Sequence, residues 1–318
     1  LALAYCLTQS AWTWGSYWAL IQHDFVSIIT IKLVSSETAL LVLLFLLFFT
    51  RMKYRIKEIE KVLVHLTVFN AFFYCIQCLF RPARDACGLI GNPSMGVAFG
   101  AMVYPFIMRA VKRQQIPTIQ LVWVPASILI SATSVSTGAF FLMLMTYVSV
   151  EHWRYIKQGI KEAWYFYVLP VLFFLIALIY QGPKELFDSS GRFRVYGEVL
   201  KDFWHHVFWW GNNGLGTTPF FLPKLQEETG ANTAYFLWIH SDILQFAWEV
   251  GFIGLIFCTP FFYYLIKKSK HSSVMSASLA GLFGCALFNF PFHLFLTSFA
   301  GTFILLYPFF IDEKKMAS

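Results

Sequence analysis

Apolar runs long enough to cross a lipid bilayer dominate this chain, and they limit its fold more than any other feature. A spanning helix needs roughly 20 predominantly apolar residues. By that measure we expect about ten spans, at residues 1–20, 32–50, 62–80, 93–110, 118–132, 136–150, 164–180, 238–266, 273–290 and 294–311. The sequence therefore predicts an all-α, polytopic integral membrane protein with a single transmembrane domain over residues 1–318.

The overall composition argues against a water-soluble domain. Hydrophobic residues make up 58% of the chain and charged residues 13%, whereas soluble domains carry about 25% charged residues. A chain of this size has too little polar surface to keep so much apolar area away from water. The aromatic content of 19% agrees with this, because aromatic side chains gather at membrane interfaces.

The basic residues follow the positive-inside pattern of membrane proteins. If residues 51–61 are cytoplasmic, strict alternation of the spans makes the inner side basic. The inner residues are then Arg51, Lys53, Arg55, Lys57, Lys61, Arg109, Lys112, Arg113, Arg154, Lys157, Lys161, Lys267, Lys268, Lys270, Lys314 and Lys315. The net charge of +7 is thereby explained by membrane topology, and we expect no nucleic-acid partner.

One long polar segment, residues 181–237, interrupts the apolar runs and is predicted to form a large loop on the periplasmic side. Its acidic and basic residues nearly balance. Five aromatic residues would suit a helix that lies at the membrane interface: Phe203, Trp204, Phe208, Trp209 and Trp210. Because long loops in compact proteins are usually functional or disordered, and aromatic residues argue against disorder, we interpret this loop as functional.

The passage from this loop into the next span contains ionisable side chains. On a helix, Asp242, Gln245 and Glu249 share one face. Ionisable groups in membrane helices face the bundle interior or a wet cavity. His240 would lie at the outer mouth of the span, where a neutral imidazole can take a proton from a hydroxyl group. The alternative is an interfacial histidine that hydrogen-bonds a neighbour.

Arginines within the loop form a second candidate site. Arg192 and Arg194 follow Ser189-Ser190-Gly191, and a guanidinium group can grip phosphate oxygens at two points. Gly214 and Gly216 would let backbone N–H groups approach an anion. The spacing is not that of a Walker or dinucleotide-binding loop. An ordinary turn with solvated arginines is the alternative interpretation.

A shorter loop carries Arg81 and Arg84. The same topology assigns them to the outer side, where they could add positive charge to the same cavity. The alternative is a short loop with interfacial arginines.

No metal site is expected. Cys75 and Cys78 form an isolated C-x-x-C pair without a second pair or a nearby histidine. The adjacent His205 and His206 would point apart on a helix, and no carboxylate is well spaced to join them.

These clusters, in this order, resemble the O-antigen ligase and O-antigen polymerase family, together with related bacterial oligosaccharyltransferases that act on pilin. The resemblance covers about half of the chain, from Gly91 to Gly254. The matching positions are Gly91-Asn92-Pro93, Ser190-Gly191-Arg192, Trp204, Gly214-Leu215-Gly216, His240, Leu244, Glu249, Gly251 and Gly254. Each motif alone is degenerate, and their order and topology carry the resemblance.

The resemblance implies a multi-pass protein of the bacterial inner membrane. Such a protein transfers a glycan from undecaprenyl diphosphate to an acceptor on the periplasmic side, without metal or other cofactor. His240 would be the base that activates the acceptor hydroxyl, and Arg192 would hold the diphosphate. The residues expected around the substrate are Arg194, Arg84, Arg81, Trp204, Gly214, Gly216, Asp242 and Glu249.

The sequence departs from the family at one place. Family members tend to carry Ser-Arg-Gly between two spans before the large loop, whereas this chain reads Ser134-Val135-Ser136-Thr137-Gly138. A second phosphate-binding arginine is therefore missing there, and Arg84 or Arg81 is the candidate substitute. The acceptor is left open among a glycan, a lipid A core and a protein.

A non-catalytic polysaccharide or lipid transporter, or a flippase, is the alternative function. Such a protein is expected to carry charged residues along a continuous pathway and to contain broken helices.

Overall fold

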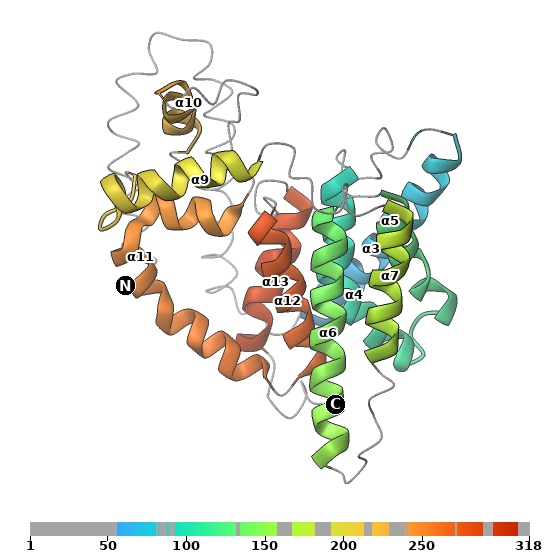
Figure 1. Cartoon of the computed structure of the whole chain (residues 1–318). Helices are drawn as coiled ribbons and strands as arrows, with labels where there is room; N and C mark the ends of the chain where they lie inside the picture. The colour runs from blue at the N-terminus through green and yellow to red at the C-terminus, as the bar shows by residue number, and fades with distance from the viewer. Residues whose placement is uncertain are drawn as a thin grey trace. The chain divides into compact units, whose positions relative to one another are not determined.

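The computed structural model describes twelve stretches or single positions, with gaps between them, and all its regular elements are helices (Figure 1). The described residues are 56–80, 82, 88, 93–131, 134–157, 167–181, 192–212, 218–228, 239, 241–270, 272–288 and 295–310. The all-α prediction is confirmed for this part of the chain. The spans predicted at 1–20 and 32–50 lie outside the described residues.

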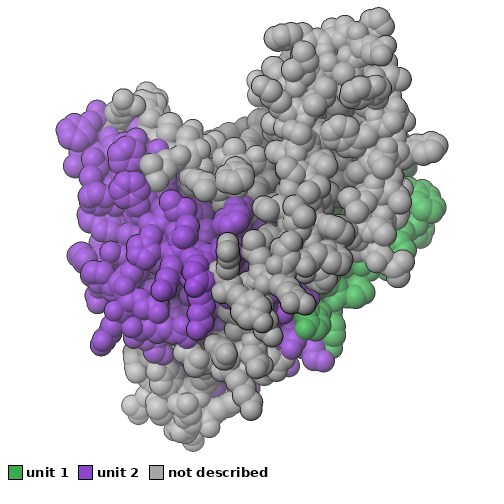
Figure 2. Space-filling view, turned by 180° about the vertical axis from the view of Figure 1, so that it is seen from behind, with its two compact units in different colours: residues 1–43, 189–264, 286–293 green, residues 44–188, 265–285, 294–318 purple. Residues whose placement is uncertain are grey.

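The chain divides into two compact units, coloured separately in Figure 2. Unit 1 comprises Leu1–Leu43, Ser189–Tyr264 and Ala286–His293, and unit 2 comprises Leu44–Asp188, Leu265–Cys285 and Leu294–Ser318. Most of the predicted periplasmic loop therefore belongs to unit 1, together with the first part of the helix that follows it. The single transmembrane domain stays a prediction.

Unit 2 is a bundle of packed helices. They are α3 (Ile56–Phe80), α4 (Pro93–Lys112), the short η4 (Thr118–Leu121), α5 (Trp123–Ser131), α6 (Ser134–Lys157), α7 (Val168–Gln181), α12 (Ser273–Phe288, as far as Cys285) and α13 (Phe295–Phe310). Phe99, Met102, Phe106 and Ile107 of α4 are fully buried, because α4 packs against α3, α5, α6 and α13. The core of unit 2 is thus built around α4.

Glycines bring α12 close to its neighbours. A Cβ atom added at Gly281 would lie 2.9 Å from the carbonyl oxygen of Ala101 in α4. A Cβ atom at Gly284 would lie 3.0 Å from the Cα atom of Ala139 in α6. Small residues at such contacts let helix backbones approach closely, which is typical of helix pairs in membranes.

The helix positions predicted from hydrophobicity agree with the described helices apart from their ends. The helix predicted at 238–266 spans Asp242–Ser269, and the described residues 239 and 241 before it are not helical. The two largest extensions are at the start of α3, which begins at Ile56 instead of 62, and at the end of α6, which continues to Lys157 instead of 150. Both extensions carry charged residues. A helix satisfies its backbone hydrogen bonds regardless of side-chain polarity, so the apolar pattern marks the apolar core of a helix and not its ends.

A buried ion pair joins three helices of unit 2. Arg109 of α4 is 6% exposed, and its Nη2 atom lies 2.7 Å from Oε1 of Glu60 in α3. The same Nη2 donates to the hydroxyl of Tyr307 in α13 at 2.7 Å, and that hydroxyl donates to Oε2 of Glu60 at 2.9 Å. The Arg109 guanidinium also lies 5.0 Å from the ring centre of Phe106. Arg109, which the charge pattern assigned to a cytoplasmic loop, is therefore a buried helix residue.

Among the described residues, two helices are long and apolar enough to cross a bilayer: α3 and α11 (Asp242–Ser269). Shorter apolar helical stretches occupy Thr118–Ser131, Pro170–Ile179, Ser273–Leu287 and Phe299–Phe310. This criterion concerns length and composition alone, and buried core helices of soluble proteins meet it as well.

Candidate functional site

Unit 1 contains the helical part of the predicted periplasmic loop, packed against the beginning of α11. Helix α9 (Arg192–Asp202) continues into a π-helical turn, η6 (Phe203–Val207), and α10 (Thr218–Glu228) follows. Their shared core consists of Val195, Val199, Phe203, Leu222, Ile239 and Trp248. The helix predicted for the aromatic part of the loop is confirmed as far as Val207, and its location at a membrane interface stays a prediction.

Helix α9 and the first part of α11 lie side by side and run in the same direction (Figure 1). Trp248 Nε1 donates to Oδ2 of Asp202 at 2.7 Å. Farther along both segments, the backbone N–H of Phe252 donates to the carbonyl of Phe208 at 2.7 Å. In these two contacts, the later residue of one segment meets the later residue of the other. The two helices are therefore parallel, and the N-terminal ends of α9 and α11 lie at the same end of the pair.

Helix α11 is broken at Gly251, and the turn after η6 fills the break. Gly251 has φ 67° and ψ −177°, and Gly211 in the turn also has a positive φ of 74°. The backbone on both sides of Gly251 forms hydrogen bonds with this turn. Ile253 N–H donates to the Trp209 carbonyl at 3.2 Å, and Asn212 N–H donates to the Trp248 carbonyl at 2.8 Å. Both glycines are required because the two backbones touch. A Cβ atom at Gly211 would lie 2.5 Å from the nitrogen of Gly251.

The carboxylate of Glu249 lies at the start of α10. Glu249 is 2% exposed, and its Oε1 accepts from the backbone N–H of Thr218 at 3.1 Å and from the Thr218 hydroxyl at 2.6 Å. Gln245 Nε2 donates to the same oxygen at 3.1 Å. The first N–H groups of a helix have no partner within it, and negative charge there is favourable. Glu249 therefore caps α10 from a distant part of the chain.

This cap leads to a prediction about stability. Changing Glu249 to leucine should lower the free energy of unfolding by about 3 kcal/mol, because hydrogen bonds to a charged group are worth about 1.5–3 kcal/mol each and the Thr218 donors stay buried. Thermal unfolding of the purified protein in detergent measures the effect. The matched control is Glu228→Leu, at an exposed position of α10. Equal unfolding temperatures for both variants would show that the cap contributes little.

Asp202 joins α9 to a buried tryptophan and to an exposed histidine. Its Oδ2 accepts from Trp248, and its Oδ1 lies 2.9 Å from Nδ1 of His206. Trp248 is fully buried, so it fixes the carboxylate. The side chain of His206 is largely exposed. Within the described residues, no group of three or more His, Cys, Asp or Glu side chains could hold a metal ion.

Five of the predicted site residues fall within the described part of unit 1. Arg192 is the first residue of α9, although its side chain lies outside the described structure. Arg194 is exposed, and Trp204 is 63% exposed with its ring stacked on Phe208. Asp242, the first residue of α11, and Glu249 are both buried. The sequence predicted that these two acidic residues face the bundle interior or a wet cavity, and their burial agrees with the first of these placements.

The remaining predicted site residues lie outside the described residues: His240, Arg81, Arg84, Gly214 and Gly216. The residues on either side of His240, Ile239 and Ser241, are both buried. Ile239 belongs to the same buried core as Val195, three positions after Arg192. Ile239, directly before His240, and Val195, three positions after Arg192, thus share one hydrophobic core.

Sequence reasoning missed the residues that hold this unit together. No local sequence pattern marks these residues. Thr218 bonds to Glu249, 31 positions away in the chain, and Asp202 bonds to Trp248, 46 positions away. Gly211 lies a few residues before Gly214 and Gly216 in the sequence, but only its close approach to Gly251 shows why a glycine is needed there.

Comparisons with protein-family models, with curated proteins and with solved structures found no match to this chain.

Proposed function

We propose that this protein is a membrane glycosyltransferase of the O-antigen ligase or polymerase type. It transfers an oligo- or polysaccharide from undecaprenyl diphosphate to an acceptor hydroxyl on the periplasmic side of the bacterial inner membrane. In this proposal the chain crosses the membrane about ten times, and residues 181–237 form the periplasmic loop. The acceptor is a glycan, a lipid A core or a protein.

One observation carries the proposal: the helix that begins at Arg192 and the helix that directly follows His240 are parallel neighbours in unit 1. Asp202 of α9 contacts Trp248 of α11. With a rise of 1.5 Å per residue, Arg192 lies about 15 Å before Asp202 along α9, and Asp242 lies about 9 Å before Trp248 along α11. The two starts are therefore offset by only about 6 Å along the pair. Two helix N-termini at one end favour a bound anion such as a diphosphate.

The chemistry needs a base and a cationic site. His240 takes the proton of the acceptor hydroxyl, and the acceptor oxygen bonds to the anomeric carbon of the donor sugar. The bond from that carbon to the diphosphate oxygen breaks, and its electron pair leaves with the lipid diphosphate. Arg192, supported by Arg194, stabilises the charge that builds up there, which is commonly the largest contribution to catalysis. Trp204 offers an exposed ring for sugar stacking.

The test of the base is His240→Ala, with His205→Ala as the matched control at an exposed position of the same unit. Glycan transfer from a purified lipid-linked donor should fall at least about a hundredfold, as expected for loss of a general base. Both variants should reach the membrane in normal amounts. Transfer by His240→Ala at the level of the control would refute the proposed role of His240.

The test of the diphosphate site is Arg192→Lys. The ammonium group keeps the charge but loses the two-point grip on phosphate, so turnover should fall at least about tenfold, while Arg113→Lys at an exposed position outside unit 1 should leave it unchanged. Steady-state transfer kinetics with varied donor concentration measure the effect. Near-normal turnover by Arg192→Lys would contradict diphosphate binding by this residue.

The break in α11 favours a second candidate, a polysaccharide or lipid transporter or flippase, because broken helices line the substrate sites of many transporters. In this chain, however, the backbone groups at the break bond to Phe208, Trp209 and Asn212, which leaves fewer of them for an ion or a substrate. Reconstituted vesicles separate the two functions. A transporter moves the lipid-linked glycan without an acceptor, whereas the transferase produces a new glycosidic bond only when the acceptor is present.

A further inference from the structure

The break in α11 and the turn that fills it mark a boundary along this helix. We propose that the surface of the lipid bilayer crosses α11 at Gly251, so that only the part after the break enters the lipid. The part before it, Asp242–Val250, then lies outside the hydrocarbon. The interaction surface consists of Trp209, Trp210 and Phe252, and its partner is the head-group layer of the bilayer. The proposal rests on the membrane location, which belongs to the proposed function, but it is independent of glycan transfer.

The turn that bonds to the break cannot lie within the hydrocarbon. Its residues 208–212 are not helical, and Trp209 and Trp210 are 58% and 65% exposed, so the protein does not enclose it. Non-helical backbone that faces lipid does not occur inside the hydrocarbon, where no water can bond to its N–H and C=O groups. The Phe252 ring stacks on the Phe208 ring of this turn, with ring centres 5.0 Å apart. Phe252 therefore lies at the edge of the hydrocarbon, at the level where tryptophan rings gather in membrane proteins.

The two parts of α11 differ in polarity as this boundary requires. The part before the break carries Asp242, Gln245 and Glu249, whereas the stretch from Phe252 to Ile266 contains no charged residue. Apolar side chains of that stretch point outward, and Ile256 is 52% exposed. Ionisable groups are costly in hydrocarbon, so the first part suits the water side and the second part suits lipid. Figure 1 shows that the first part runs beside α9 and that the second part leaves this pair at an angle.

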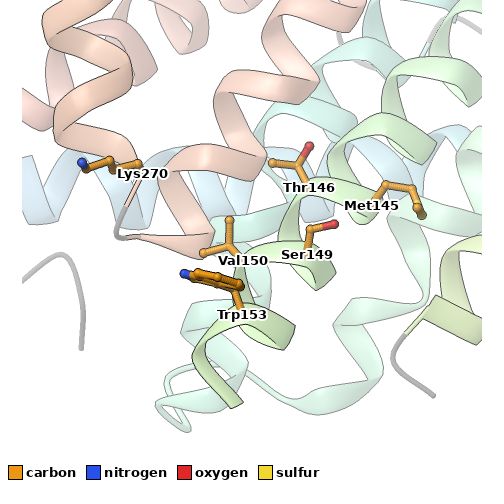
Figure 3. Close-up of a pocket in the computed structure, with 6 residues that line it drawn as sticks. All are labelled: Met145, Thr146, Ser149, Val150, Trp153 and Lys270. Carbon is orange, nitrogen blue, oxygen red and sulfur yellow. The ribbon is translucent and has the colours of Figure 1, made fainter. Parts of the chain in front are cut away.

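The other end of α11 carries the residue types expected at the opposite surface. From Phe252 to Ser269 the helix is about 27 Å long at 1.5 Å per residue, close to the thickness of about 30 Å of the hydrocarbon core. Lys267 and Lys268 lie in its last turn, from which long basic side chains reach the surface. Lys270, directly after α11, and Trp153 of α6 line one pocket (Figure 3). Tryptophan and lysine side chains are typical of membrane interfaces, so both ends of the charge-free stretch match a bilayer surface.

The reaction of introduced cysteines with a water-soluble maleimide measures where the boundary lies. The matched pair is Ile243→Cys before the break and Ile256→Cys after it, at positions where the native side chains are 38% and 52% exposed. The full chain is labelled in open membrane fragments, so that the reagent reaches both surfaces, and mass spectrometry of peptides separates introduced from native cysteines. Because the reaction needs a thiolate, which hydrocarbon suppresses, Ile256→Cys should react at least about tenfold more slowly than Ile243→Cys. After denaturation in SDS the two rates should be equal.

Three results would overturn the proposal. Slow labelling of both cysteines would place the boundary before Ile243, and equally fast labelling of both would show that Ile256 does not lie in lipid. An apolar carbene precursor dissolved in the bilayer should modify the wild-type chain between Phe252 and Ile266, and no modification there would mean that protein, such as a second copy of this chain, covers that stretch. Retention of the wild-type chain in membranes after alkaline extraction is measured separately, so failure of the boundary and failure of the membrane location are distinguishable.

Discussion

Replacing Gly251 by alanine is expected to separate α11 from the turn after η6 and to lower the free energy of unfolding by about 3 kcal/mol or more. Its φ and ψ angles of 67° and −177° fall in a region that only glycine adopts without strain. The new methyl group would also collide with the backbone nitrogen of Gly211 and would lie 2.6 Å from the carbonyl carbon of Trp210. Backbone atoms cannot move aside as the end of a flexible side chain can.

Hydrogen exchange locates this effect, and thermal unfolding in detergent measures its size. The amides of Asn212, Phe252 and Ile253, which bond across the break, should lose protection in Gly251→Ala. The matched control is Gly197→Ala in α9, where an added Cβ atom meets nothing within 4 Å. That variant should be neutral or slightly more stable, because alanine favours helix by about 1 kcal/mol over glycine. Unchanged protection of the three amides in Gly251→Ala would contradict the expected separation of α11 from the turn after η6.

The second large effect is expected at the buried ion pair of unit 2. Changing Arg109 to methionine leaves the Glu60 carboxylate buried with only the Tyr307 hydroxyl as a described partner. Removing one partner of a buried ion pair typically costs about 3–5 kcal/mol. We therefore expect a loss of that size in the free energy of unfolding, measured by thermal unfolding in detergent.

A double variant tests the cause of this loss. Glu60→Met together with Arg109→Met removes both charges, and it should recover most of the lost stability, because a buried ion pair replaced by apolar residues of similar size is often neutral. Arg113→Met, at an exposed position beyond α4, is the control and should change stability by less than about 0.5 kcal/mol. A double variant as unstable as Arg109→Met would show that lost packing, and not the uncompensated charge, causes the effect.

The candidate site could be predicted from the sequence only in part. The acidic residues Asp242 and Glu249 were expected to face the bundle interior or a wet cavity, because ionisable groups in a long apolar helix avoid lipid, and both are buried. The role of Glu249 was not predictable. Its partner Thr218 lies in another helix, and contacts between distant segments leave no local pattern in a sequence. The assignments of His240 and Arg192 stay proposals.

By itself, the sequence determined the type and the approximate position of the helices. Runs of apolar residues at helical length carry that information locally, and the helices α3, α4, α7, α12 and α13 begin or end within six residues of the predicted positions. Only the tertiary structure decided which charges are buried and where a helix breaks. Arg109 belonged to a basic cluster in the sequence, yet Glu60 and Tyr307 enclose it in the bundle. Gly251 breaks α11 because the turn at Gly211 supplies bonds across the gap, and such bonds exist only once both segments have folded together.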